Sequence, residues 1–520
     1  MTASLKNNPF STQKELPPYI GANWSTLDYA YDFLSFINKN PTEFHATQYV
    51  AKVLETHGFV YLPERSSWTD VPEFVAVTAK GSGGRFYTTR NGTSLAAFVV
   101  GPDWVPGNSI GLVGAHIDAV TAKLKPVSRV ETSDENGAYI RLGVAPYGGG
   151  LSPVWLDRDL GLAGRLIVKE EPEENEKEEA ALGLGLGVKK TTTIKSKLIN
   201  LDYPIARIPT LAPHFGDVSR EAYNLETQMV PLIGLESSYG SDYDLEPSDE
   251  EKKSPIVHDH DIRLLRAVAE AADGISVGSI LRAELQLYNF QPGQLGGLER
   301  EFIFAPRLDD KLCVYASLHG LLASLDETPA DVVSMVAYYD DEEVGSLTRQ
   351  GARGTLFQTA VERLAAHYPE GTDEGLRATY ANSFFVSADT THAVNPNFAE
   401  VYLEHHKPKL NTGITIKYNV NMANTTDSVS ASLIEEVCRR TGNKWQRFHI
   451  RNDSRSGGTI GPALSAATGI KSLDVGIPQL AMHSIRATTG TQDPGLGVKF
   501  FKGFFGTWAT VDEEYKAGGL

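Results

Sequence analysis

Cysteine, basic residues and long apolar runs are all scarce in this sequence. Only 2 of its 520 residues are cysteine, which excludes a disulfide framework of the kind that stabilises small secreted proteins. No apolar stretch reaches the roughly 20 residues needed to cross a bilayer, and the N-terminal stretch MTASLKNNPFSTQKELPPYI lacks the charged-then-apolar layout of a secretory signal. We therefore expect no membrane association, and a reducing compartment such as the cytosol.

Negative charge outweighs positive charge. Lys and Arg number 48 against 65 Asp and Glu, a formal net charge of −17, and no basic stripe stands out that could neutralise phosphates. Nucleic acid is therefore not an expected partner. The hydrophobic share of 41% and the charged share of 22% are ordinary for a globular protein. The length exceeds that of one average domain, so we expect two domains or one large core with an insertion.

The pattern of polar and apolar residues changes several times along the chain. Residues 1–25 are polar and contain proline, which predicts a tail, and residues 23–59 include the apolar spacing of two helices. Short apolar runs bounded by Gly, Pro or Asp then recur, and they are typical of strands: FYTTR, SLAAFVVG, SIGLVGAH, EFIFAPRL, VVSMVAYYD, SFFVSAD, GITIKY and SLDVGI. Several are separated by amphipathic stretches such as 312–325, so an α/β sheet covered by helices is predicted.

Between about 119 and 300, helical periodicity is mostly lost. This region contains the acidic stretch KEEPEENEKEEAALGLGLGVKK at 169–190, which has almost no large apolar residues. We predict an exposed loop there and favour a solvated loop over a binding tail. The run HDHD at 258–261 resembles a metal site, but it directly precedes a helical pattern, so Asp259 or Asp261 more simply caps a helix.

Potential metal ligands follow five of the predicted strands. In chain order they are His116, Asp309, the pair Glu342 and Glu343, Asp389 and His483. Functional groups in open α/β sheets collect beyond the carboxyl ends of the strands, so we expect these side chains to meet. Two imidazoles and three or four carboxylates suit zinc, manganese or cobalt, and the lack of Cys ligands favours an open catalytic site. Taken alone, Asp309 or Asp310 is at least as compatible with a helix N-cap as with a metal ligand.

Two further features refine this predicted site. Asp118 lies two residues after His116, so in an extended segment Asp118 can orient the imidazole. The run VAYYDDEEVGS at 336–346 places four carboxylates together after an apolar strand, and such crowding raises their pKa values unless they bind something. In a two-metal site, one of Glu342 and Glu343 can hold a metal ion while the other acts as general base.

The motifs around these residues resemble those of one metallopeptidase family, which contains aspartyl aminopeptidase and fungal vacuolar aminopeptidase I. The resemblance runs from about residue 25 to 515, in VGAHIDAVTAKLKPV, APYGGGLSPVWLDRDLGLAGR, RIPTLAPHFG, FIFAPRLDDKLC, DDEEVGSLTRQGA, SADTTHAVNPNF, NDSRSGGTIGP and PQLAMHSIRATTG. It implies a mixed-sheet α/β catalytic domain with helices on both faces, made of residues 26–118 and 301–520. A β-rich dimerisation domain would interrupt it at 119–300.

The resemblance also implies a site with two divalent metal ions, expected to be zinc. By this resemblance, His116 and Asp389 would bind one ion, Glu343 and His483 would bind the other, and Asp309 would bridge the two. Glu342 would be the general base, and Asp118 would orient His116. His214 would reach into the active site of a neighbouring subunit. Assembly would be a dodecamer built from dimers. The implied activity is removal of N-terminal residues from peptides with a free amine.

The same resemblance implies a substrate preference, and at one position this chain departs from the family pattern. The stretches WLDRDLG, GSLTRQGA, SRSGGTIGP and LGVKFFKGFF look closer to the vacuolar branch, which favours neutral or apolar N-terminal residues such as Leu. The aspartyl branch is expected to carry a cationic pocket residue, whereas Asn421 stands at the aligned place. We expect the neutral preference, with an aspartyl aminopeptidase as the alternative. The departure is Asp341, where the family usually has Asn, and it is expected to affect metal affinity or the pH optimum.

Localisation and two other function classes stay open at this point. The N-terminal tail is shorter than the delivery propeptide of vacuolar aminopeptidase I and shows no clear amphipathic repeat, so vacuole and cytoplasm both remain. In the first case an autophagy-type delivery receptor would be a partner. The other classes are a catalytically silent self-assembling shell, which the intact ligand set disfavours, and another co-catalytic metallohydrolase such as a carboxypeptidase or deacylase. Substrates blocked at the amine would separate the latter from an aminopeptidase.

Overall fold

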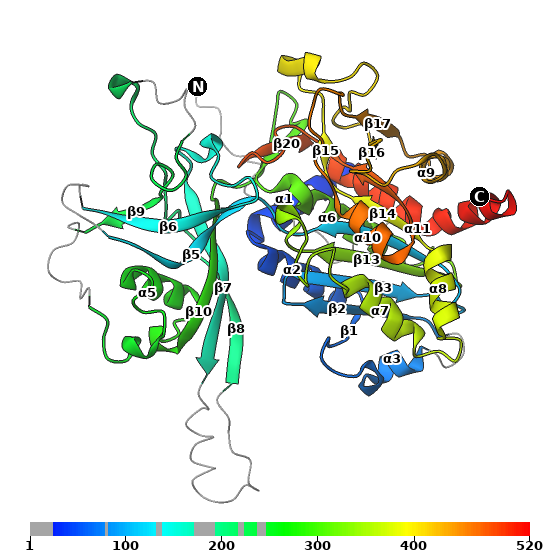
Figure 1. The fold of residues 1–520 in the computed structure, drawn as a ribbon, viewed down its shortest axis with the longest axis horizontal. Helices are drawn as coiled ribbons and strands as arrows, with labels where there is room; N and C mark the ends of the chain where they lie inside the picture. The colour runs from blue at the N-terminus through cyan, green and yellow to red at the C-terminus, as the bar shows by residue number, and fades with distance from the viewer. Residues whose placement is uncertain (1–23, 78–81, 132–137, 171–192, 217–222, 237–245) are drawn as a thin grey trace, which may run out of the picture.

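A computed structural model describes residues 24–77, 82–131, 138–170, 193–216, 223–236 and 246–520. The chain forms two units that lie side by side, a large α/β unit and a smaller β-rich unit (Figure 1). The small unit is inserted into the large one, because its strands come after β4 and before β12 in the chain. Within these described residues, none of the helices has the length and apolar character needed to span a bilayer.

The large unit is organised around a nine-stranded mixed sheet. In spatial order its strands are β1 Val60–Tyr61, β2 Gly84–Arg90, β3 Ser94–Val100, β13 Val333–Tyr339, β4 Ile110–His116, β14 Phe384–Ala388, β18 Lys471–Gly476, β16 Ile414–Tyr418 and β17 Trp445–His449. The central strands β13, β4, β14 and β18 are parallel to one another. Their carboxyl ends therefore share one edge of the sheet.

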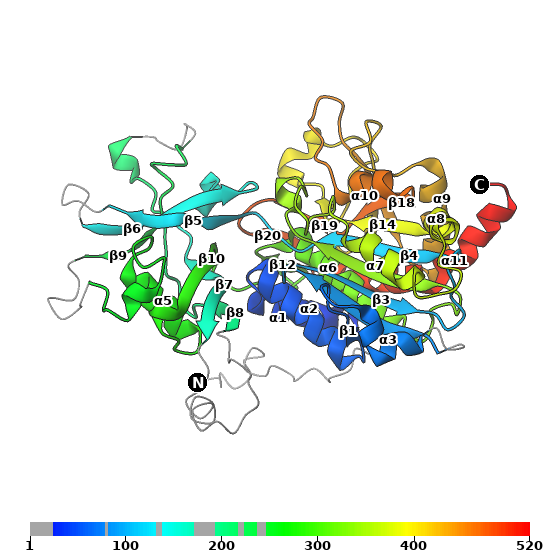
Figure 2. The same cartoon turned by 60° about the horizontal axis from the view of Figure 1, so that its bottom comes forward.

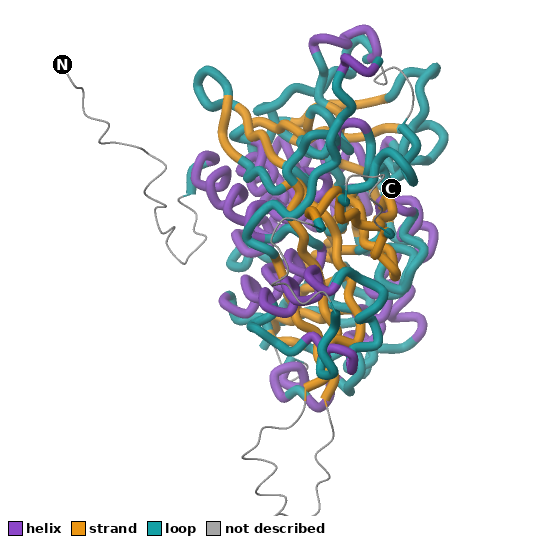
Figure 3. Tube along the Cα trace, turned by 90° about the vertical axis from the view of Figure 1, so that its left-hand side faces the viewer, coloured by secondary structure: helices purple, strands orange, loops and turns teal. Residues whose placement is uncertain are grey.

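Helices cover both faces of this sheet, as predicted. One face carries α1 Thr26–Lys39, α2 Glu43–Thr56, α6 Leu308–Ala323, α9 Ser428–Thr441 and α11 Asp493–Ala517, and the other carries α3 Pro72–Ala76, α7 Leu356–Ala365, α8 Asp373–Asn382 and α10 Ile460–Thr468. Figures 2 and 3 show helices on either side of the strands. The pair α1 and α2 confirms the prediction for 23–59, and the side chains of Ser25 and Thr42 cap these two helices.

The central strands are apolar on both sides because both of their faces are buried. In β13, Met335, Ala337 and Tyr339 point into the core that includes α7 and α10, while Val336 and Tyr338 point into the core that includes α6 and α11. All five side chains are at most 1% exposed. This two-sided burial explains why such strands appear in the sequence as continuous apolar runs.

In the described residues, the small unit is a six-stranded antiparallel sheet on which the helix α5 Ile262–Ala271 packs (Figure 1). In spatial order its strands are β8 Thr193–Asn200, β7 Leu160–Glu170, β10 Ile280–Asn289, β5 Thr121–Val130, β6 Tyr139–Tyr147 and β9 Leu232–Leu235. The Asp261 side chain accepts a hydrogen bond from the Arg263 backbone N–H and caps α5. The run HDHD is therefore a helix start, as predicted.

Three predictions about segments of the chain are only partly covered by the structure. The six strands of the small unit all fall within 119–300, but its assignment as a dimerisation domain stays a prediction. The acidic stretch 169–190 begins inside β7, and its residues 171–190 lie outside the described part of the chain. Residues 1–23 of the predicted tail lie outside it too.

One of the strands predicted to precede a metal ligand does not belong to the main sheet. EFIFAPRL contains β12 Phe302–Ala305, which pairs with β11 Gln294–Gly296 and β20 Ala487–Gly490 in a separate three-stranded sheet. A further two-stranded sheet joins β15 Thr391–His392 to β19 Pro478–Gln479. The chain turns at Arg307, which has a left-handed φ of 56°. Asp309 therefore reaches the edge of the main sheet from the start of α6 rather than from a strand of that sheet.

Candidate metal centre

Side chains from several segments meet at the carboxyl edge of the main sheet. Three neighbouring strands supply four of them. Glu342 and Glu343 follow the end of β13, His116 is the last residue of β4, and Asp389 directly follows β14. Asp309 comes from the start of α6, and His483 from the loop between β19 and β20. These six side chains, the predicted ligands and the predicted base, all line one pocket.

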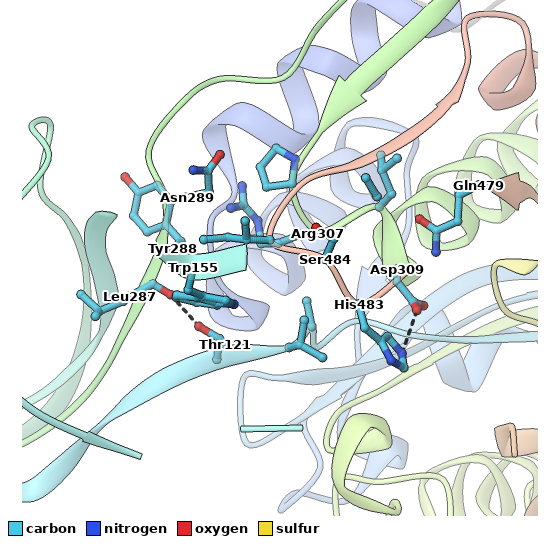
Figure 4. A pocket seen from close by; sticks show the side chains of 16 residues that line it. Thr121, Trp155, Leu287, Tyr288, Asn289, Arg307, Asp309, Gln479, His483 and Ser484 are labelled. Atoms are coloured by element: carbon cyan, nitrogen blue, oxygen red, sulfur yellow. Dashed lines mark hydrogen bonds and ion pairs between the residues drawn. The ribbon is translucent and has the colours of Figure 1, made fainter. Parts of the chain in front are cut away.

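Asp309 is at the centre of this cluster. Its Oδ1 lies 3.2 Å from Nε2 of His116, and its Oδ2 lies 3.3 Å from Nε2 of His483. Figure 4 shows the second of these contacts. Oε2 of Glu343 lies 3.5 Å from the same nitrogen of His483, and Oδ1 of Asp389 lies 4.0 Å from Nε2 of His116. One carboxylate thus faces two imidazoles, and each imidazole has a second carboxylate beside it, which is the arrangement suited to two bridged ions.

The ring of His116 is held from behind by Asp118. Oδ1 of Asp118 lies 3.2 Å from Nδ1 of His116, and the two residues are only 1% and 2% exposed. A carboxylate at Nδ1 keeps a proton on that nitrogen and leaves Nε2 able to bind a metal ion. His116 is therefore oriented toward the centre of the cluster, as the spacing of these two residues predicts.

Glu342 and Glu343 are adjacent but have different surroundings. The backbone of Asp341 is left-handed, with a φ of 60°, so the chain turns sharply where β13 ends. Glu343 lies beside His483, whereas the Glu342 carboxylate lies 4.0 Å from Nε2 of His116 and has no hydrogen bond to any residue that the structure describes. Burial, together with neighbouring carboxylates, raises the pKa of Glu342 to about 7 and that of Glu343 to about 8.

The donor atoms of this cluster fit zinc. Imidazole nitrogen and carboxylate oxygen are both zinc ligands, and His116, Asp309 and Glu343 offer atoms that lie within 4.8 Å of one another. Oε1 of Glu343 is buried and has no hydrogen-bond partner in the described part of the chain, as expected of an oxygen that binds a cation. Burial also raises the pKa of Asp389. Positive charge at the centre of the cluster would therefore stabilise these carboxylates.

Two residues singled out from the resemblance lie outside this pocket. His214 is in the exposed 3₁₀ turn Pro213–Phe215 of the small unit and does not line the pocket. Asn421 is exposed on the loop after β16, and it does not line the pocket either. Within one chain, neither side chain belongs to the cluster.

The structure adds two charged residues to those predicted for the site. Lys417, near the end of β16, places Nζ 3.4 Å from Oδ2 of Asp389, which leaves Oδ1 of Asp389 facing His116. Asp310 accepts hydrogen bonds from the backbone N–H groups of His116 (3.3 Å) and Thr390 (3.1 Å), and so ties the ends of β4 and β14 together. In the sequence, the only indication of a role for Lys417 is its position as a charged residue within the apolar run ITIKY.

A third addition comes from the small unit. Tyr147, the last residue of β6, places its hydroxyl 2.7 Å from Oδ2 of Asp118. Burial, and then the charge of Asp118, raises the pKa of Tyr147 far above its ordinary value of 10, so the hydroxyl keeps its proton and acts as a donor. In the sequence, Tyr147 stands out only as part of the motif APYGGG, one of those that carry the family resemblance.

All of these residues fall within a match to a known protein family. A family model described as aminopeptidase I zinc metalloprotease (M18) matches residues 36–505. The chain belongs to the M18 family. It is 43% identical to vacuolar aminopeptidase 1 of Saccharomyces cerevisiae, over 98% of this chain and 95% of that one. It is 37% identical to aspartyl aminopeptidase of Aspergillus oryzae, over 92% and 95%. The crystal structure of prApe1 resembles it with a TM-score of 0.85 at 44% identity, covering 94% of this chain and 97% of that one.

Membership of the M18 family confirms the enzyme class predicted from the motifs. The chain is a hydrolase, a metalloaminopeptidase of a zinc-dependent family. The mixed α/β fold is confirmed by the same structural resemblance. The silent shell and the carboxypeptidase or deacylase alternatives lose their support.

Proposed function

We propose that this M18 enzyme removes neutral or apolar N-terminal residues, such as Leu, from peptides with a free amine. The proposed ligands of two zinc ions are His116, Asp309, Glu343, Asp389 and His483. The observation that carries this proposal is Asp309, whose two oxygens face the two imidazoles at 3.2 and 3.3 Å. When bound, zinc polarises the scissile carbonyl as a Lewis acid and lowers the pKa of the attacking water.

Glu342 is the side chain suited to move the proton. Its carboxylate lies among the proposed ligands, and the described residues leave it without a hydrogen bond. A carboxylate that lies beside the proposed ligands without another partner is placed to act as a general base. We propose that Glu342 accepts the proton of the attacking water and returns it to the leaving amine, while Asp118 keeps His116 oriented.

The wall of the pocket supports the neutral preference. The cavity has a volume of about 400 Å³, and its apolar lining residues are Phe448, Ile450, Ile460, Ala463 and Met482. Lys417 is the buried cation of the wall, and it is already paired with Asp389. An apolar substrate side chain would bury its surface against this wall without leaving a charge unpaired.

One observation favours the alternative, an aspartyl aminopeptidase. Arg353 also lines the pocket and is exposed, and its side chain has no ion-pair partner among the described residues. Its backbone N–H donates to the carbonyl oxygen of Ser346, close to the glutamate pair. A guanidinium in that position could pair with an acidic substrate side chain.

Hydrolysis of a panel of amino-acid anilides tests the proposal. The panel includes Leu, Ala, Asp, Glu and Lys anilides and an N-acetylated Leu anilide, with metal-stripped protein to which zinc, manganese or cobalt is returned. We expect zinc-dependent cleavage that is fastest for Leu and absent for the acetylated substrate. Faster cleavage of Asp or Glu, lost in Arg353→Gln, would establish the aspartyl alternative instead.

We further propose that the enzyme works as a dodecamer built from dimers. The structure of the Saccharomyces cerevisiae mApe1 dodecamer resembles this chain with a TM-score of 0.79 at 42% identity. Exposed apolar side chains on the strands of the small unit, Val127, Tyr139 and Leu235, suit an interface. In such an assembly the exposed His214 would enter a neighbouring active site and stabilise the transition state. Analytical ultracentrifugation of the full chain tests the assembly.

Localisation to the vacuole or the cytoplasm is part of the same proposal. The 43% identity to vacuolar aminopeptidase 1 supports the vacuole. The resemblance to the structure of the Ape4 and Nbr1 complex supports binding of a partner protein, which we propose to be a delivery receptor. Cell fractionation with vacuolar and cytosolic markers tests this, because a receptor-delivered enzyme would move to the vacuolar fraction.

A further inference from the structure

The YGGG turn at 147–150, which ends β6 of the small unit, lies against the metal centre of the large unit. Tyr147 is only 9% exposed. Its hydroxyl lies 2.7 Å from Oδ2 of Asp118 and 3.0 Å from Oδ1 of Asp341, so its one proton is shared between two carboxylates. A residue of the inserted unit therefore contacts both the partner of His116 and the residue that precedes the glutamate pair.

Tyr147 completes the set of contacts around Asp118. Oδ1 of Asp118 faces Nδ1 of His116 at 3.2 Å, and Oδ2 also accepts a hydrogen bond from the backbone N–H of Glu343 at 3.1 Å. With Tyr147, the carboxylate has three partners from three segments, which fixes its rotation. Because an outer carboxylate sets the orientation of a ligating imidazole, fixing Asp118 also fixes His116.

Asp341 links the same hydroxyl to the loop that carries the glutamates. Its Oδ2 accepts hydrogen bonds from Oγ1 of Thr348 (2.6 Å) and Nε2 of Gln350 (3.3 Å), while Oδ1 faces Tyr147. The carboxylate at this position therefore has a hydrogen-bonding neighbour at each oxygen. The departure from the usual Asn is accommodated by Tyr147, Thr348 and Gln350.

The turn is packed so tightly that Tyr147 has little freedom. Gly148 has a φ of 59°, and a Cβ there would lie 3.0 Å from Cβ of Glu343. A Cβ on Gly150 would lie 1.8 Å from the carbonyl oxygen of Thr121. Nζ of Lys123 lies 4.0 Å from the centre of the Tyr147 ring, on the inner strand β5. The position of the hydroxyl is therefore set by the backbone and packing of the small unit.

We propose that Tyr147 is a positioning residue of the zinc centre, through which the small unit holds Asp118 and His116 in the orientation that binds metal. The inference rests on the proposed roles of His116 and Asp118. It gives the inserted unit a part in metal binding within its own chain, in addition to its proposed part in assembly.

Tyr147→Phe tests this inference, because it removes the hydroxyl and keeps the ring. The matched control is Tyr203→Phe, also in the small unit, where the side chain is 46% exposed. We expect Tyr147→Phe to weaken zinc binding about 10-fold, measured by competition with a chromophoric chelator. The visible spectrum of the cobalt(II)-loaded variant should change, and kcat for Leu anilide should fall with KM nearly unchanged. The control should match the wild type in every measurement.

Wild-type zinc affinity and an unchanged cobalt spectrum in a folded, assembled Tyr147→Phe variant would overturn the inference. Gly148→Ala provides a second route if that variant does not fold, since displacing the turn from Glu343 should also weaken zinc binding. His116→Ala separates this inference from the proposed function. If His116→Ala retains full zinc affinity, the proposed metal site itself is wrong; if it loses zinc and Tyr147→Phe does not, only the role of Tyr147 is wrong.

Discussion

The large and small units would contribute to the proposed active site in different ways. In the large unit, His116, Glu343 and Asp389 come at or just after the ends of buried strands that share one sheet edge. In the small unit, Tyr147 is the last residue of a strand of mixed burial, and His214 lies in an exposed turn. The comparison teaches that side chains that meet on a common parallel edge can be recognised from sequence, whereas groups supplied by a second unit are recognised from the fold or from a related family.

The largest expected effect is in the large unit, at the proposed base. Glu342→Gln removes the proton acceptor and leaves the proposed ligands in place, so we expect kcat to fall by about 10²–10⁴-fold. Zinc content, measured by elemental analysis, and assembly should stay unchanged. Glu404→Gln is the control, because that side chain is 88% exposed. A rate near that of the wild type in Glu342→Gln would refute the assignment.

The corresponding test in the small unit is His214→Ala. We expect kcat to fall by about 10²-fold, the size of effect seen when one transition-state hydrogen-bond donor is removed, with zinc content unchanged. Co-expression of the His214→Ala and Glu342→Gln variants tests whether the two residues act in one active site from different subunits. A His214→Ala subunit keeps its base and could receive His214 from a Glu342→Gln neighbour, so mixed assemblies should recover activity that neither variant has. If mixing restores nothing, His214 does not act across subunits.

A smaller effect is expected from a buried histidine in the core of the large unit. His319 is 1% exposed, and burial lowers its pKa from 6.5 to about 3. Below pH 6.5 the unfolded chain binds a proton that the folded chain does not, so the stabilising contribution of neutral His319 is full above pH 6.5 and is lost as the pH falls toward 3.

Between pH 7.5 and 5.5, the wild type should therefore lose about 1.4 kcal/mol more stability than His319→Leu. Urea unfolding at both pH values measures the difference. His405→Leu, at a side chain that is 85% exposed, is the control. If the small unit unfolds first and separately, only the later transition, that of the large unit, should show this pH dependence. Such a result would show that the two units differ in their response to pH. An equal pH dependence in wild type and His319→Leu would contradict the expectation.

The smallest expected effect compares one helix cap in each unit. Asp261 caps α5 of the small unit, and Asp427 caps α9 of the large unit by accepting a hydrogen bond from the Ser430 backbone N–H at 2.7 Å. Replacing either by Ala should cost about 1 kcal/mol. Thermal unfolding should show one shared transition that both variants lower if the units unfold together. Separate transitions, each sensitive to one cap, would show that they unfold independently.

Much of the large unit could be predicted because its chemistry is local in the sequence. The apolar runs before His116, Glu342 and Asp389 indicated strands, and the strand-end argument brought the polar residues together. The origin of Asp309 could not be predicted in this way. Its preceding strand, β12, belongs to another sheet, and the turn at Arg307 redirects the chain.

Other parts of the site could not be predicted because they depend on contacts between distant segments. Lys417 lies more than 25 residues after Asp389 in the sequence, yet the pairing of β16 with β18 brings it to 3.4 Å from that carboxylate. The contact of Tyr147 with Asp118 requires the small unit to fold back on the large one. No periodicity or motif spacing encodes such a contact.

The two passages of the chain between the units both lie at the candidate metal centre. The chain leaves the large unit between Asp118 and Thr121, and it returns through β12 to Asp309. Both passages therefore end at residues of the cluster. A change in the orientation of the small unit would therefore displace Asp309, the proposed bridge, and Asp118, the partner of His116, together.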